Sequence, residues 1–137
     1  MGATADDADQ VSALATRLGI RTGMTVQELG YDTDTDDLVA DAVVAATGEH
    51  VVNEDFDGVV DVVLLWWREG DGDLIDALVD AMPPLADNGV IWLITPKFGR
   101  SGALEPADIA DAAETCGLRR TKTLTMSNWQ GIRMVSR

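Results

Sequence analysis

Few residues of this chain belong to the types that perform covalent or proton-transfer chemistry. His50 is the only histidine, and no partner lies at a spacing typical of a catalytic pair. Cys116 is the only cysteine, which excludes an intramolecular disulfide and a cysteine-rich zinc site. Neither Ser101 nor Ser127 lies in the G-x-S-x-G pattern of a nucleophile elbow. We therefore predict no catalytic residue and no metal site, with His50 at the surface or a strand end and Cys116 as a small buried residue.

Acidic residues cluster at positions 32–37. The spacing Asp32-x-Asp34-x-Asp36 matches the first three ligand positions of a calcium loop. Asp37 replaces the glycine of the sixth position and Val43 replaces the glutamate of the twelfth. We interpret the cluster as the N-cap and first turn of a helix, where the helix dipole favours negative charge. Adventitious binding of a divalent ion stays open as the alternative.

Cations and an aromatic residue lie in two predicted connections near the C-terminal half. Lys97 and Arg100 share a loop with two glycines, so they could hold an anion or contact a partner. The alternative is a flexible surface loop, and the loop has no P-loop pattern. Trp129 lies in a predicted hairpin turn, where it is either an exposed anchor for a partner or packed back on the sheet edge.

Apolar periodicity and turn residues predict alternating helices and strands. Helices are expected at 6–18, 36–47, 73–85 and 105–116, and strands at 24–29, 59–67, 89–95, 121–126 and 131–136, with a short strand at 50–52. Continuous apolar runs such as VVDVVLLWW are typical of strands buried on both faces of a parallel sheet. We predict one α/β domain over 1–137, a three-layer sandwich with a mostly parallel sheet that ends in an antiparallel hairpin.

Ligands of such sheets bind at the carboxyl ends of the strands. We therefore expect a crevice lined by Gly30, Tyr31, Asp32, Trp67 and Arg68, which follow or end two of the predicted strands. Trp67 and its neighbour Trp66 should face opposite sides of the sheet, because side chains alternate along a strand.

The net charge of −14 and the 46% of hydrophobic residues narrow the function classes. Residues 1–90 hold 20 acidic and three basic residues, whereas 91–137 hold four acidic and seven basic ones. The acidic excess argues against nucleic-acid binding, and the hydrophobic content argues against disorder. No apolar run is long enough for a membrane helix, and the acidic N-terminus does not match a signal peptide, so we expect a cytoplasmic protein. The charge asymmetry either serves solubility or gives a bipolar molecule that attracts a charged partner.

Four stretches resemble S-adenosylmethionine-dependent methyltransferases of the Rossmann type, in a shortened form. They are LGIRTGMTVQELGYD around the first strand, DVVLLWW, LVDAMPPLADNGVIWLITP, and the closing CGLRRTKTLTMSNWQGIRMVSR. The resemblance implies a cofactor at a glycine-rich turn after the first strand. Glu28 and Gly30 match that turn, but Asp32 and Asp34 replace its later glycines, and only 53–58 separate the short strand from the next. The third strand and much of the adenine pocket should therefore be missing.

The chain also resembles an uncharacterised family of small actinobacterial proteins, a domain of unknown function. The stretches that carry this resemblance are KFGRSGALEPADIADAAETCGL and SNWQGIRMV. We expect a non-catalytic, methyltransferase-like module without a cofactor that binds a protein partner, with self-association between acidic and basic patches as one form of this. The alternative is a small methyltransferase, or a binder of a nucleotide-like ligand, that retains S-adenosylmethionine binding in an altered pocket.

Overall fold

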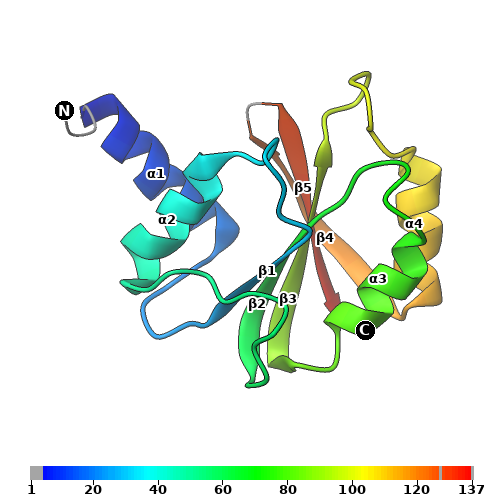
Figure 1. Cartoon of the computed structure of the whole chain (residues 1–137), viewed down its shortest axis with the longest axis horizontal. Helices are drawn as coiled ribbons and strands as arrows, with labels where there is room; N and C mark the ends of the chain where they lie inside the picture. Colours follow the sequence, from blue (N-terminus) through cyan, green and yellow to red (C-terminus); the bar gives the residue numbers. More distant parts are fainter. Residues whose placement is uncertain (1–4, 127, 137) are drawn as a thin grey trace.

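Two pairs of helices enclose one five-stranded sheet in the computed structural model, which describes residues 5–126 and 128–136 (Figure 1). The helices are α1 (Ala5–Leu18), α2 (Asp37–Thr47), α3 (Leu74–Ala81) and α4 (Pro106–Thr115). The strands are β1 (Val26–Leu29), β2 (Val60–Trp66), β3 (Leu85–Pro96), β4 (Leu118–Met126) and β5 (Trp129–Ser136). Within this described part of the chain, no helix has the length and apolar character needed to cross a membrane.

The sheet has the strand order β1-β2-β3-β5-β4. β1 pairs with β2 and β2 with β3 in parallel, whereas β5 runs antiparallel to both β3 and β4. The predicted fold class is confirmed: an α/β sandwich with a parallel part that ends in an antiparallel hairpin. The parallel pairs place the carboxyl ends of β1, β2 and β3 at one edge, which is where ligands bind in sheets of this kind.

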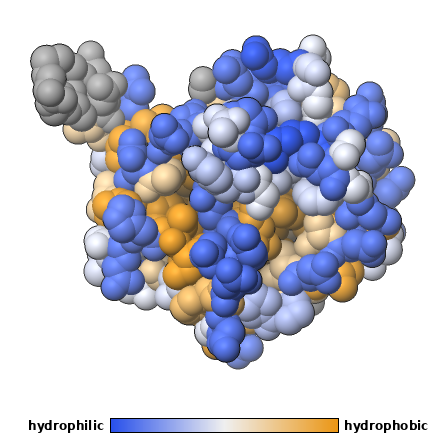
Figure 2. Space-filling model, viewed as in Figure 1, coloured by the Kyte–Doolittle hydropathy of each residue, from blue (hydrophilic) through white to orange (hydrophobic). Residues whose placement is uncertain are grey.

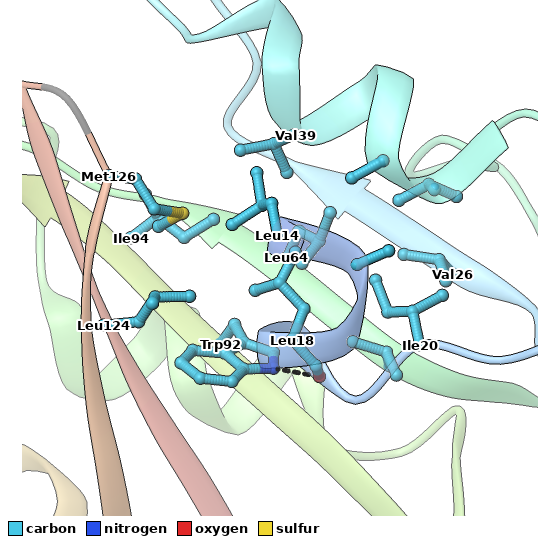
Figure 3. Close-up of a cluster of buried hydrophobic side chains, with 14 of the residues drawn as sticks. Leu14, Leu18, Ile20, Val26, Val39, Leu64, Trp92, Ile94, Leu124 and Met126 are labelled. Atoms are coloured by element: carbon cyan, nitrogen blue, oxygen red, sulfur yellow. Dashed lines mark hydrogen bonds between the residues drawn. The ribbon is translucent and has the colours of Figure 1, made fainter. Parts of the chain in front are cut away.

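Alternating side chains of β2 and β3 supply both halves of the core, as the continuous apolar runs predict. Leu64 and Trp92 pack with α1 and α2, whereas Val63 and Leu93 pack with α3 and α4. Figure 3 shows the first cluster, in which the indole Nε1 of Trp92 donates a hydrogen bond to the carbonyl oxygen of Leu18 (3.1 Å). This bond ties the end of α1 to the middle of the sheet.

Several boundaries differ from the sequence-based prediction, among them the end of α3 and the starts of β3 and β5. The third helix ends at Ala81, not residue 85, because Pro83 and Pro84 cannot continue it. The chain turns there, and β3 begins at Leu85, which pairs with Val60. Trp129 is the first residue of β5 and pairs with Met126, so it does not lie in the turn. Ser127, assigned to the same turn, lies outside the described residues.

The segment between α2 and β2 is the shortened part of the fold. The short strand expected at 50–52 is a single parallel bridge between Val52 and Gln27. The backbone of Val52 forms hydrogen bonds with both neighbours of Gln27. Its N–H donates to the carbonyl oxygen of Val26, and its carbonyl oxygen accepts from the N–H of Glu28, each at 2.8 Å. This segment therefore covers the free edge of β1 without forming a further strand.

Candidate functional site

The tips of β1 and β2 approach closely at Gly30 and Trp66. Their parallel register pairs Leu29 with Leu65, so Gly30 lies beside the end of β2. Gly30 has a φ of 75°, and a Cβ atom added to it would lie 2.2 Å from the backbone oxygen of Trp66. Only glycine fits this position, because the obstructing atom belongs to the backbone of a central strand. The glycine that was expected to line the crevice thus allows the two strand tips to lie close together.

The side chain of Arg68 fills the space above these tips. Its Nη2 and Nε donate to Oδ1 and Oδ2 of Asp34 at 2.6 and 3.1 Å, and its Nη1 donates to the carbonyl oxygen of Gly30 at 2.9 Å. Asp71 completes the set: its Oδ2 lies 3.3 Å from Nη1 and accepts the backbone N–H of Arg68 at 3.0 Å. The guanidinium holds the pKa of the Asp34 carboxyl below its usual value, chiefly through the side-chain hydrogen bond. We call Gly30, Asp34, Arg68 and Asp71 the Arg68 cluster.

Two tryptophans support the Arg68 cluster from below. The guanidinium carbon of Arg68 lies 5.3 Å from the centre of the Trp129 ring, a distance that permits a cation–π interaction. Trp129 meets Trp66 edge to face, with ring centres 4.9 Å apart. Trp66 donates from Nε1 to Oε2 of Glu28 at 2.9 Å. Burial raises the pKa of the Glu28 carboxyl, the Trp66 bond opposes this rise, and the charge of Asp37 adds to it.

The acidic loop forms turns and a helix cap, as its non-metal interpretation predicts. The Asp36 carboxylate accepts the backbone N–H of Leu38 at 2.9 Å and caps α2. Asp32 accepts the N–H of Thr33 at 2.7 Å, and its carbonyl oxygen accepts from the Thr35 hydroxyl at 2.9 Å. Asp32, predicted to line the crevice, therefore closes a turn. Its neighbour Asp34, whose role no sequence pattern indicated, reaches Arg68 instead.

The remaining predicted site residues are distributed over four places. Trp67 faces away from Trp66, as predicted, and lines a separate pocket between α3 and α4 and not the crevice with Arg68. Trp129 is only 5% exposed, so of its two alternatives the structure takes the packed one. Lys97 is half-buried and Arg100 exposed, both beside Phe98, which is 60% exposed. Tyr31 is 64% exposed and does not contact the Arg68 cluster through a hydrogen bond.

A pocket of about 590 Å³ lies on the outer side of β1. Glu28, Gly30 and Tyr31 line it from β1 and its loop, and the bridge segment lines it from Val51 to Glu54. A second pocket shares Leu29 and Glu54 with it, and Figure 2 shows hydrophobic surface on both sides of a hydrophilic ridge across this front of the molecule. The open space at the carboxyl end of the sheet thus lies beside β1, not between β1 and β2.

Several solved structures have a similar fold, and most of those reported below are named as methyltransferases. The pyocyanin biosynthetic protein PhzM matches with a TM-score of 0.69 at 12% identity over 95% of this chain, which spans only 55% of the PhzM chain. Magnesium protoporphyrin IX methyltransferase (ChlM) from Synechocystis, with bound SAM, matches with a TM-score of 0.57 at 16% identity, covering 96% and 79% of the two chains. A TehB-like SAM-dependent methyltransferase from Corynebacterium glutamicum gives 0.54 at 13% identity, covering 93% and 87%. At such identities the likeness shows the fold, which is that of a shortened methyltransferase.

Sequence relatives occur in mycobacteria. Uncharacterized protein Rv2239c from Mycobacterium tuberculosis is 50% identical over 134 residues, covering 98% of this chain and 85% of the relative. Uncharacterized protein Mb2263c from Mycobacterium bovis matches equally well. The model of the family described as "Protein of unknown function (DUF3052)" matches residues 15–137, and the chain belongs to this family.

Proposed function

We propose that this protein is a non-catalytic, methyltransferase-like module that acts by binding a protein partner. The observation that carries the proposal is the Arg68 side chain between the tips of β1 and β2, held by Asp34 and by the Gly30 oxygen. In the resembled enzymes a glycine turn leaves this space open for the cofactor. Here the chain fills it with its own side chains.

The charges around the Arg68 cluster also fit the amino-acid end of S-adenosylmethionine poorly. Two carboxylates, those of Asp34 and Asp71, already match the single guanidinium. A cofactor carboxylate would have to displace Asp34 from its bidentate hydrogen bonds with Arg68. It would then lie next to the acidic loop that continues to Asp37 and be repelled by it. This poor fit supports a role for the protein that does not involve methyl transfer.

The surface offers cations that form no ion pair with the described residues of the molecule. In residues 5–126 and 128–136, Arg68 is the one cation in an ion pair. Six other cations are exposed: Arg17, Arg21, Arg100, Arg119, Arg120 and Lys122. Charges that are unpaired in the free protein speed association with a complementary partner and sharpen partner choice. This supports binding to another protein as the role left to a fold whose ligand crevice is filled.

Affinity capture tests the proposal. The full chain, tagged and expressed in a mycobacterial host, is expected to retain a stoichiometric partner at about 0.1 M salt and to release it at about 0.5 M, because screening shortens the range of charge attraction. Calorimetry with S-adenosylmethionine is expected to show no heat of binding. A chain that retains no partner at any salt concentration, or a partner insensitive to salt, contradicts the proposal.

The pocket beside β1 supports a second candidate, a binder of a nucleotide-like ligand. Its volume of about 590 Å³ suits a small molecule. The exposed Tyr31 ring provides a stacking surface, and Glu54 and Asn53 provide acceptors for ribose hydroxyls. Neither Tyr31 nor Glu54 belongs to the Arg68 cluster, so this pocket can bind a ligand while the crevice stays filled.

Thermal-shift and calorimetric titrations with S-adenosylmethionine, its demethylated product and ATP separate the two candidates. The ligand pocket would be favoured over the interaction module if one of these ligands binds, if Tyr31→Ala and Glu54→Gln each abolish the binding, and if Asp55→Asn leaves it intact. Asp55 is exposed and next to Glu54 but does not line this pocket, so it controls for the charge change. Absence of heat and of a thermal shift with all three ligands removes the second candidate.

A further inference from the structure

A groove between α3 and α4 combines an apolar floor with an acidic rim. It has a volume of about 320 Å³ and lies on the face of the sheet opposite α1 and α2, where Figure 1 shows α3 and α4 together. Trp67 and Leu104 are part of its floor. Its rim carries four carboxylates, those of Glu69, Asp73, Asp108 and Asp111.

One of the four rim carboxylates, that of Asp73, is held by a hydrogen bond to the backbone, and none of the four is paired with a cation of the described residues. Asp73 caps α3 and accepts the N–H of Ile75 at 2.9 Å, and Asp108 lies in the first turn of α4. None of the four forms an ion pair with a cation among residues 5–126 and 128–136. The charge of Asp73 also acts on the interior. Burial raises the pKa of the Cys116 thiol, and the charge of Asp73 raises it further. The groove thus brings four carboxylates together with no side-chain cation in the described part of the chain paired to them.

Trp67 gives this groove a surface that binds cations. The residue is half-buried against the core, and its ring lies against Gly72, where an added Cβ would be 3.7 Å from the ring. A tryptophan face attracts an ammonium or guanidinium group, and nearby carboxylates strengthen that attraction. Leu104 offers an apolar contact for the methylene stem that lysine and arginine carry behind their charge.

We propose that this groove is the docking surface for a lysine- or arginine-rich segment of the partner protein, with one cationic side chain against Trp67. The inference rests on the proposed function and names the chemistry of the partner. The net charge of −14 decides between two occupants. A second copy of this chain would bring the same negative charge and be repelled as a whole, whereas a basic segment is attracted before contact.

A short synthetic peptide of alternating lysine and alanine probes the groove, with a glutamate–alanine peptide of equal length as its control. Titration followed by NMR is expected to move the indole N–H signal of Trp67. The corresponding signals of Trp66 and Trp92 should stay in place, because both donate within the core. The acidic peptide is expected to move none of them. A lysine peptide that leaves the Trp67 signal unmoved overturns the proposal.

Two groove variants and one matched control separate a local site from general attraction to an acidic protein. Trp67→Leu and the double variant Asp108→Asn/Asp111→Asn should each bind the lysine peptide about tenfold more weakly. Asp41→Asn/Glu49→Gln removes the same charge from exposed positions outside the groove and should change the affinity less than about twofold. If both double variants weaken peptide binding equally, the peptide is attracted only by the overall negative charge of the protein, and the proposal is overturned.

The native partner gives an independent outcome. A groove variant that still retains the captured partner overturns the docking proposal and leaves the proposed function intact. A wild-type chain that captures no partner overturns the proposed function, whatever the peptide does. The chain alone could also form a dimer that the groove substitutions dissociate. That result would mean that a second copy, and not a basic segment, occupies the groove, and it also overturns the docking proposal.

Discussion

Arg68 binds the carboxylate of Asp34 through a bidentate pair of hydrogen bonds, in which Nη2 donates to Oδ1 at 2.6 Å and Nε donates to Oδ2 at 3.1 Å. The pair joins the loop after β1 to the end of β2, so it closes the crevice that parallel sheets of this kind usually leave for a ligand. The arginine side chain is 15% exposed and the aspartate side chain 55% exposed. Water therefore screens the pair from one side, and its geometry contributes more than its charge alone.

Asp34→Asn should destabilise the fold by about 1 kcal/mol at neutral pH, the usual scale for a partly exposed pair with good geometry. The loss should shrink in high salt. Since the folded-state pKa of Asp34 lies below its usual value, the pair stabilises the protein above the unfolded-state pKa and is lost as pH falls through the folded-state pKa. Urea unfolding of both proteins across acidic pH measures this. Asp55→Asn, an exposed change outside the cluster, serves as the control, and an equal loss there would contradict the assignment.

The sheet could be predicted because its signals are local. A continuous apolar run marks β2 as buried on both faces, and glycines mark the ends of α1 and α2. The sequence predicts a turn before β5 that extends too far, because Trp129 lies between the polar residues Asn128 and Gln130 but belongs to the strand. Trp129 and Met126 are both apolar and buried, and they pair with each other across the turn. Two apolar residues separated by only two positions are the signal that indicates a tighter hairpin.

The Arg68 cluster could not be predicted in full because it depends on register between distant segments. Arg68 and Gly30 were both assigned to the crevice, and they do meet. Whether Asp32 or Asp34 reaches the arginine depends on how the loop turns before α2, which composition does not determine. Which of Trp66 and Trp67 faces Arg68 depends on which side of the sheet α1 occupies, so alternation along the strand leaves the choice open.

Gly30→Ala should cost more stability than the same change at Gly48, although both glycines have nearly the same positive φ, 75° and 79°. At Gly48, which ends α2, an added Cβ meets nothing within 4 Å, so only the backbone conformation opposes it, by about 1–2 kcal/mol. At Gly30 the methyl group would also collide with the backbone oxygen of Trp66, adding about 1–3 kcal/mol. Denaturant unfolding of the two variants measures the difference, and equal losses would show that the strand tips separate freely.

Glu28→Gln should stabilise the protein at neutral pH. Burial, the largest cause, raises the folded-state pKa of Glu28, so the ionised carboxylate opposes folding. The wild-type protein therefore loses stability as pH rises from the unfolded-state pKa through the folded-state pKa, whereas the glutamine variant keeps it and can still accept the Trp66 N–H. Melting temperatures across this pH range test the prediction.

Asp37→Asn is the companion variant for Glu28. Because the charge of Asp37 raises the folded-state pKa of Glu28, removing it should make the stability loss smaller and complete at lower pH, without abolishing it. A Glu28→Gln protein whose pH profile matches that of the wild type would mean that Glu28 is solvated in solution.

Thr95→Val should raise stability by about 1 kcal/mol, because the Thr95 hydroxyl is buried and finds no hydrogen-bond partner among the described residues. Valine has nearly the same shape and favours a strand as strongly, so the change removes an unsatisfied polar group from β3 with little effect on packing. Thr125→Val on β4 is exposed and should change stability by less than about 0.5 kcal/mol. Urea unfolding compares the two variants with the wild type. A loss of stability in Thr95→Val alone would show that the hydroxyl has a bound partner in solution, such as an ordered water in the layer beneath α3 and α4.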